Sequence, residues 1–250
     1  MKPWYETAFG SEYLELYPHR DDEEAAKDVA SIIQLIDPAR TEPLLDLGCG
    51  AARHLLALHE AGFTKLVGLD LSTDLLASAA QRIDVAGAEG IELVRSDMRH
   101  IPFQRRFGTV LSIFTSFGYF PSDEEDAQVV QAAFAALKPA GQFLLDTLGR
   151  ASTISGLVPE EEKTIGSRTL KIRRQLSEDG RRVEKETRVW SGGSEIGTFR
   201  ESVRMYQPEE LVAVFREAGF ENVRTYGSVA GEPQAPTSRR LVVVGRKPTS

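Results

Sequence analysis

The chain has 250 residues, of which 41% are hydrophobic, and its formal net charge is -7. This provides enough apolar side chains for one sizeable core, and the acidic balance argues against broad electrostatic capture of DNA or RNA. Cys49 is the only cysteine, so an intrachain disulfide is excluded, and no metal-ligand spacing, signal peptide or membrane-spanning apolar run is visible. We therefore expect a cytoplasmic globular protein with no metal, membrane or nucleic-acid partner.

Short apolar runs alternate with helical patterns through the first 150 residues. Residues 22–36 place apolar side chains on one helical face, and Asp37-Pro38 ends this pattern. Further helices are predicted at 51–61, 73–86 and 123–137, and strands at 43–47, 66–69, 91–95, 110–114 and 142–147, the last after a turn at 138–141. Alternating strands and helices indicate an α/β fold with a doubly wound, mostly parallel sheet.

The pattern changes after about residue 150. Three charged, half-exposed strands are predicted at 169–176, 182–190 and 195–206, with glycine turns between them. A helix at 208–218 and strands at 223–226 and 241–244 then complete a sheet of seven strands. We therefore expect one domain over residues 1–250, with a helical lid at 1–40 and a small antiparallel β insertion at 151–206 that serves as a substrate cap or dimer surface.

A glycine loop follows the first predicted strand. Gly48 and Gly50 allow the backbone to approach a ligand closely. Asp70 ends the second strand, where a carboxylate can accept hydrogen bonds from the hydroxyls of a ribose. These features fit both a dinucleotide and S-adenosylmethionine.

Asp46 distinguishes between these two ligands. It lies two residues before Gly48, where it would repel a pyrophosphate but attract the cationic methionine moiety of S-adenosylmethionine. Arg53 also occupies the position of the third glycine in the dinucleotide pattern. The loop therefore favours S-adenosylmethionine.

With these residues in place, the chain resembles the Rossmann-like class I S-adenosylmethionine-dependent methyltransferases. The resemblance is carried by Leu45–Gly50, Gly68–Ser72, Ser96–Met98 and Leu137–Gly141, and it covers most of residues 40–146. It implies that Asp97 bonds the adenine amino group. It also implies a methyltransferase (EC 2.1.1) that releases S-adenosylhomocysteine.

A looser resemblance connects the chain with a bacterial branch that methylates small molecules. Its marks are Tyr13–Arg20, Phe114–Phe120 and the β insertion, and antibiotic-sugar and glycine N-methyltransferases share this layout. The branch implies transfer to N, O or C of a small molecule by a monomer or homodimer. It does not identify the acceptor.

The protein mainly supplies positioning and desolvation when the methyl group is already activated. An acceptor must still lose a proton, and His19 is the leading candidate base, whereas His54 is better explained as a structural residue. Residues after the fourth strand face the ligand crevice. The candidates are His19, Tyr17 and Tyr119 for catalysis; Asp46, Gly48, Gly50, Arg53, Asp70, Leu71, Asp97, Met98, Phe114, Thr115 and Ser116 for the cofactor; and Tyr13, Arg20, Phe117 and Arg239 for the substrate.

Structural roles remain open for several of these residues. Arg53 suits a solvated helix position as well as the cofactor carboxylate, and Tyr13 and Tyr17 suit an aromatic staple under the lid. Arg239 suits a solvated turn.

Three other functions compete with the small-molecule methyltransferase. They are an NAD-linked oxidoreductase, a non-catalytic S-adenosylmethionine-binding protein and an RNA methyltransferase. Asp46 argues against the first, and the acidic charge argues against the third.

Overall fold

The structure is a computed structural model that describes residues 3–6, 8–10 and 22–249. Its main sheet has seven strands in the order β10-β11-β5-β4-β1-β2-β3. β11 runs antiparallel to both of its neighbours, and the other described pairs are parallel. The predicted α/β fold class is therefore confirmed. The strands are β1 (Leu44–Leu47), β2 (Leu66–Asp70), β3 (Ile91–Arg95), β4 (Phe107–Ser112), β5 (Leu137–Leu148), β10 (Glu221–Tyr226) and β11 (Arg240–Arg246).

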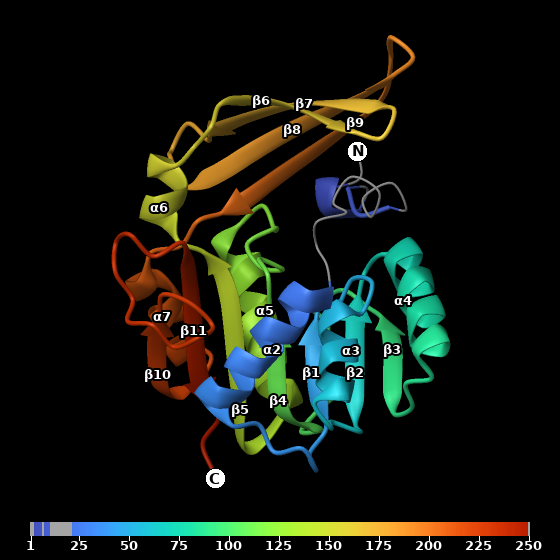
Figure 1. The fold of residues 1–250 in the computed structure, drawn as a ribbon. Helices are drawn as coiled ribbons and strands as arrows, with labels where there is room; N and C mark the ends of the chain where they lie inside the picture. Colours follow the sequence, from blue (N-terminus) through green and yellow to red (C-terminus); the bar gives the residue numbers. More distant parts are fainter. Residues whose placement is uncertain (1–2, 7, 11–21, 250) are drawn as a thin grey trace.

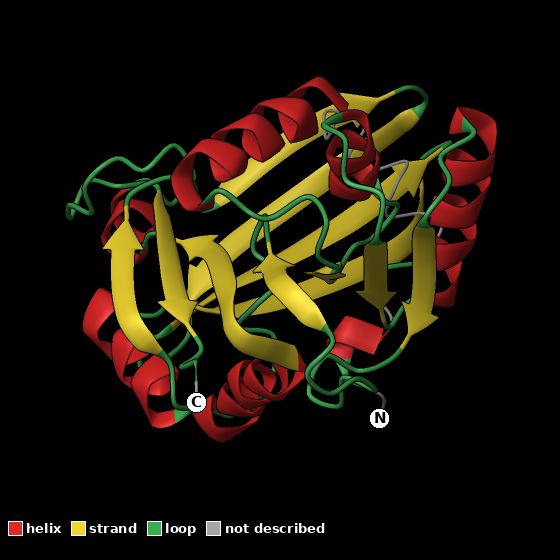
Figure 2. Cartoon of the chain, turned by 90° about the horizontal axis from the view of Figure 1, so that it is seen from below, coloured by secondary structure: helices red, strands yellow, loops and turns green. Residues whose placement is uncertain are grey.

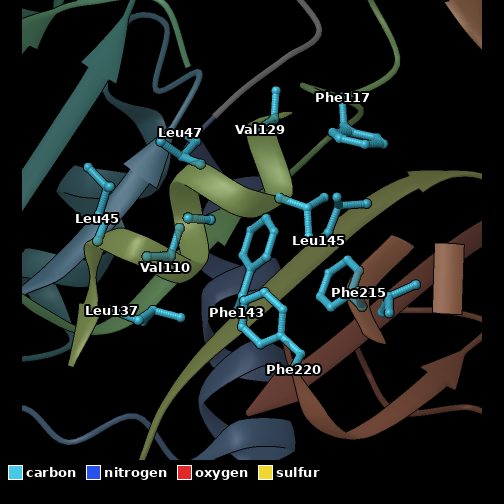
Figure 3. Packing of buried hydrophobic residues seen from close by; sticks show 14 of the residues in the cluster. Leu45, Leu47, Val110, Phe117, Val129, Leu137, Phe143, Leu145, Phe215 and Phe220 are labelled. Carbon is cyan, nitrogen blue, oxygen red and sulfur yellow. The ribbon is translucent and has the colours of Figure 1, made fainter. Parts of the chain in front are cut away.

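Helices cover both faces of this sheet (Figure 2). One hydrophobic cluster joins α5 and α7 to the sheet through Val129, Phe215 and Phe143 (Figure 3). A second cluster joins α2, α3 and α4 to the opposite face through Ile32, Leu55 and other apolar residues. The helices are η1 (Trp4–Glu6), α2 (Asp22–Ile36), α3 (Arg53–Glu60), α4 (Thr73–Ala86), α5 (Asp123–Ala136), α6 (Arg150–Ser155) and α7 (Pro208–Glu217).

A separate antiparallel sheet has the order β6-β7-β8-β9. It consists of β6 (Glu160–Ile165), β7 (Arg168–Leu176), β8 (Arg182–Ser191) and β9 (Ser194–Arg204). Figure 1 shows it above the edge of the main sheet at which β5 ends and leads into α6. It lies within the predicted insertion.

Two details of the sequence prediction were wrong. β6 was not predicted, because its sequence Glu160–Ile165 lacks an apolar alternation; ion pairs such as Arg174–Glu161, 2.7 Å, link it to β7. The predicted turn at 138–141 is an irregularity within β5, where the register shifts and Ala140 has a positive φ of 63°.

Helix α2 packs against α3 and buries Ala25, Val29, Ile32 and Ile36. It therefore covers one face of the sheet. The rest of the predicted lid includes residues 11–21, which lie outside the described residues, so the lid stays a prediction.

A charge network around the buried Arg204 joins the insertion to α5 and α7. The Arg204 side chain is only 2% exposed and contacts Asp123 at 2.9 Å and Glu210 at 2.8 Å. Arg182 of β8 donates hydrogen bonds to the carbonyl oxygens of Gly118 and Phe120, both at 3.0 Å. The insertion thus fixes the loop that follows β4.

Candidate functional site

The glycine loop connects β1 to α3 in a conformation that suits glycine. Gly48 and Gly50 have φ values of 74° and 53°. A Cβ at position 48 would lie 2.7 Å from the Cβ of Ser116, in the loop after β4. Only glycine therefore fits at position 48. The loop is therefore packed between its neighbours before any ligand binds.

Asp70 joins this loop to the end of β2. Its Oδ2 accepts a hydrogen bond from the Gly50 amide, and its Oδ1 accepts one from the Ser72 amide, both at 2.9 Å. Burial raises the pKa of Asp70. The Ser72 hydroxyl caps α4 by accepting from the Leu75 amide.

A cavity of about 330 Å³ opens beside the loop. This volume lies within the range of small-molecule pockets. Tyr5, Phe9, His54 and Phe120 also line it, although they were not among the predicted cofactor residues. The predicted residues that line it are Gly48, Gly50, Arg53, Asp70, Leu71, Asp97, Met98, Phe114 and Ser116.

Asp46 lies behind the glycine loop and is 2% exposed. Its Oδ2 is buried without a hydrogen-bond partner. Burial raises the pKa of Asp46 to about 6, against the opposing effect of nearby His54. A buried, unpartnered carboxylate oxygen favours a cationic ligand, because an uncompensated charge is costly in an apolar environment.

Asp97 is held by Arg99. The Arg99 backbone amide donates to Oδ1 at 2.8 Å, and Nη2 donates to Oδ2 at 2.6 Å. Burial alone would raise the pKa of Asp97, but the bonds from Arg99 outweigh it and hold the pKa below its ordinary value. The Arg99 guanidinium also lies over the Phe120 ring, 4.2 Å from its centroid. The structure therefore places a cation beside the predicted adenine contact.

A second cavity, of about 1050 Å³, lies between the loop after β4, α6 and the insertion. We call it the acceptor chamber, and Thr115 and Arg239 are among its lining residues. Among the described residues, Phe9, Phe114 and Tyr119 line both this chamber and the smaller cavity. The Phe9 and Tyr119 rings stack with centroids 5.5 Å apart.

Ion pairs line the acceptor chamber. Arg174 pairs with Glu161 at 2.7 Å, and Lys185 pairs with Glu201 at 2.8 Å. These pairs place hydrogen-bond donors and acceptors along the inner face of the insertion. The chamber therefore combines apolar walls with paired charges, while its junction with the smaller cavity is aromatic.

The remaining predicted residues fall into two groups. Phe117 is 1% exposed, packs against Tyr206 in the core and lines neither cavity (Figure 3). Tyr13, Tyr17, His19 and Arg20 lie outside the described residues.

Sequence reasoning missed Asp146 and its pairing with Arg240. Asp146 lies near the end of β5 and Arg240 begins β11, so the two side chains that pair at 2.7 Å are 94 positions apart in the sequence. The only available signal was that both residues lie at the ends of predicted strands that face the ligand crevice.

In the part of the chain that the structure describes, no group of three or more His, Cys, Asp or Glu residues is arranged to hold a metal ion. No helix in residues 3–6, 8–10 or 22–249 has the length and apolarity needed to cross a bilayer.

Comparisons with known proteins agree with this geometry. Residues 44–141 match a family model described as a methyltransferase domain. The chain is 26% identical over 249 residues to the dTDP-3-amino-3,4,6-trideoxy-alpha-D-glucopyranose N,N-dimethyltransferase of Streptomyces venezuelae, with 96% of this chain and 98% of the relative covered.

Two solved structures share the fold. The CcbJ methyltransferase from Streptomyces caelestis superposes with a TM-score of 0.81 at 19% identity, over 97% of this chain and 99% of its own. An amino pentose methyltransferase from Micromonospora echinaspora, solved with S-adenosylmethionine bound, has a TM-score of 0.68 at 25% identity, over 95% and 97%.

The glycine loop, the strand-end carboxylates and these similarities agree on one cofactor. They support neither an NAD-linked oxidoreductase nor a non-catalytic binding protein. Residues 44–141 carry a methyltransferase domain, and the chain is an S-adenosylmethionine-dependent methyltransferase.

Proposed function

We propose that this enzyme transfers the methyl group of S-adenosylmethionine to an amine nitrogen of a small, hydroxylated acceptor. The observation that carries this proposal is the aromatic junction of Phe9, Phe114 and Tyr119 between the two cavities. The cofactor would occupy the smaller cavity and the acceptor the chamber. We expect the activity in the cytoplasm, in a monomer or homodimer.

On the cofactor side, one acidic side chain suits the ribose of S-adenosylmethionine and another suits its methionine moiety. Asp70 retains acceptor capacity for ribose hydroxyls beyond its two backbone hydrogen bonds. The buried Asp46 oxygen provides negative potential behind the glycine loop, close to a cationic methionine moiety. When bound, S-adenosylmethionine supplies a methyl group already activated by its sulfonium.

The aromatic junction would exclude water from the reaction path and attract a cationic group. The three rings keep water away from the path between the cavities, which favours an uncharged nucleophile. Their faces also attract a cationic group through cation–π interactions. The residues therefore hold the reacting groups in line, which is the main contribution that the protein makes to a displacement reaction.

An amine fits this junction better than a phenol or a carbon acid. Among the described residues that line both cavities, the Tyr119 hydroxyl is the only titratable group. An amine can lose its ammonium proton to water before it binds, attack through its lone pair and release the second proton to water afterwards, whereas phenols and carbon acids need a proton acceptor in the site. The junction therefore favours N-methylation.

The relatives support a sugar-like acceptor. The Streptomyces venezuelae relative is named for dimethylation of an amino sugar, and the Micromonospora structure is an amino pentose methyltransferase. The paired charges of the chamber would bind several hydroxyl groups through alternating donors and acceptors.

A matched pair of substrates tests this proposal. Purified enzyme would be incubated with methyl-labelled S-adenosylmethionine and a panel of amino sugars, each beside the same sugar with a hydroxyl in place of the amine. We expect label only in amino members of the pairs, with one S-adenosylhomocysteine released per methyl group. Transfer to hydroxyl members alone, or to no member of a broad amine panel, would refute it.

A further inference from the structure

We propose that Arg240 is a positioning residue for the turn between the cofactor cavity and the acceptor chamber. It holds this turn in a strained backbone conformation that the turn would not keep without it. The turn consists of Phe114 and Thr115. Its importance for the acceptor rests on the proposed function, but its effect on the cofactor cavity is testable without any acceptor.

The turn has an unfavourable backbone. Phe114 and Thr115 have φ values of 59° and 66°, which is the left-handed region. A bulky residue and a β-branched residue rarely adopt this region, and each position costs on the order of 1 kcal/mol or more. Other contacts must therefore hold the turn in place.

Asp146 and Arg240 provide these contacts. The Phe114 amide donates to Asp146 Oδ2 at 2.9 Å, and the Thr115 amide donates to the Asp146 carbonyl oxygen at 3.1 Å. Arg240 binds both carboxylate oxygens of Asp146 at 2.7 Å through Nε and Nη2. Its Nη1 then donates to Thr115 Oγ1 at 2.9 Å.

Arg240 thus binds the turn twice, once directly and once through Asp146. Only a planar guanidinium can hold the two carboxylate oxygens and a third acceptor at the same time. A lysine can replace the charge but not this three-point geometry. The arrangement therefore depends on arginine and not merely on a cation.

The position of Phe114 explains why the turn matters. Two guanidinium groups lie over its ring, with Arg53 4.9 Å and Arg240 6.0 Å from the ring centroid. Arg53 lines the cofactor cavity and Arg240 lines the chamber. A turn that relaxed toward negative φ would move this ring, so both cavities would change shape together.

The test uses Arg240→Lys and Thr115→Val. The first keeps a cation beside Asp146 but loses the three-point geometry, and the second removes only the Oγ1 acceptor while keeping a β-branched side chain. Arg246→Lys, an exposed position at the other end of β11, is the matched control. The probe is S-adenosylhomocysteine, measured by calorimetry, with melting temperatures recorded for each variant.

We expect about fivefold to tenfold weaker S-adenosylhomocysteine binding in Arg240→Lys and in Thr115→Val, and less than a twofold change in Arg246→Lys. The double variant should bind S-adenosylhomocysteine no more weakly than the single variant with the lower affinity. Both changes remove the same hydrogen bond, from Arg240 Nη1 to Thr115 Oγ1, so their effects do not add. Thr115→Gly should bind better than Thr115→Val, since glycine adopts a positive φ without strain. Melting temperatures of Thr115→Val and Thr115→Gly should stay close to wild type.

Unchanged binding in Arg240→Lys, or additive losses in the double variant, would overturn the inference. So would losses that merely follow the melting temperature, since these would indicate a general structural role. Failure of the amine proposal leaves this binding test intact, because it needs no methyl acceptor.

Discussion

The backbone amide of Gly50 donates a hydrogen bond to Oδ2 of Asp70 at 2.9 Å, across the gap between the loop after β1 and the end of β2. One carboxylate therefore shapes the glycine loop and also faces the cofactor cavity. Loop geometry and the proposed ribose binding would therefore be coupled through the same side chain. The loop and the acid cannot be altered independently.

Asp70→Ala should weaken S-adenosylhomocysteine binding by roughly 10- to 100-fold, because hydrogen bonds to a charged acceptor contribute about 1.5–3 kcal/mol. The loss combines ribose contacts with a looser glycine loop. Calorimetry with S-adenosylhomocysteine checks the change. Asp84→Ala, an exposed acid on the neighbouring helix α4, is the control and should bind as wild type. Equal affinity in Asp70→Ala and Asp84→Ala would contradict the assignment.

Cofactor affinity should rise with pH around the titration of Asp46. Burial raises the pKa of this carboxyl to about 6, and its charged form is the one that attracts a cationic ligand. Affinity should therefore increase as pH rises through about 6 and level off above it, and binding below this pH should release a proton. Asp46→Asn should bind more weakly at pH 8 and lose this part of the pH dependence. A wild-type pH profile in Asp46→Asn, measured by calorimetry from pH 5 to 8, would exclude Asp46 as its source.

Asp126 should make stability fall as pH rises. Burial raises its pKa to about 7, although the Tyr206 hydroxyl donates a hydrogen bond to its Oδ2 at 2.8 Å. Because the folded-state pKa is raised, the stabilising contribution is complete below about pH 4 and is lost as pH rises through about 7. For a buried group this loss amounts to about 2–3 kcal/mol between pH 5 and pH 8.

Asp126→Asn should flatten that dependence, since the amide does not ionise. The readout is the change in unfolding free energy between pH 5 and pH 8, from denaturant melts of both proteins. The absolute stability of the variant is not the test, because an amide also changes the local hydrogen bonds. An equally steep fall in wild type and Asp126→Asn would show that another group titrates.

Tyr119 variants should separate the roles of its ring and its hydroxyl. Tyr119→Phe keeps the stack with Phe9, whereas Tyr119→Ala removes it and opens the junction. If the ring excludes water and aligns the acceptor, Tyr119→Phe should retain most of the turnover, and Tyr119→Ala should lose about 10-fold or more. Initial rates with the best amino sugar of the panel check this. A large loss in Tyr119→Phe would instead assign the hydroxyl to proton transfer.

The sequence was sufficient for most of the fold. Strand and helix periods predicted the seven-stranded sheet, because buried parallel strands and amphipathic helices have strong local patterns. β6 escaped prediction because it is placed by its register with β7, which brings pairs such as Arg173 and Glu160 together, and not by its own apolar content. Such pairs are visible only when the register is known.

The sequence predicted which residues meet at the candidate site where each of them lies at a strand end and carries a side chain with a specific chemical use. Asp46 and Gly48 lie at the end of β1 and Asp70 at the end of β2, and the topology of a parallel sheet brings such positions together. The Asp146–Arg240 pair depends on adjacency of β5 and β11, and Arg99 beside Asp97 depends on side-chain direction. Neither follows from local sequence.

The identity of the methylated atom is the most direct test of the account. The enzyme would be given S-adenosylmethionine with a carbon-13 methyl group and an amino sugar that carries free hydroxyls, and the product would be examined by NMR. The account predicts a single new methyl signal with the chemical shift of an N-methyl group, coupled to the amine-bearing carbon. A methyl signal on a hydroxyl oxygen or a ring carbon would contradict it.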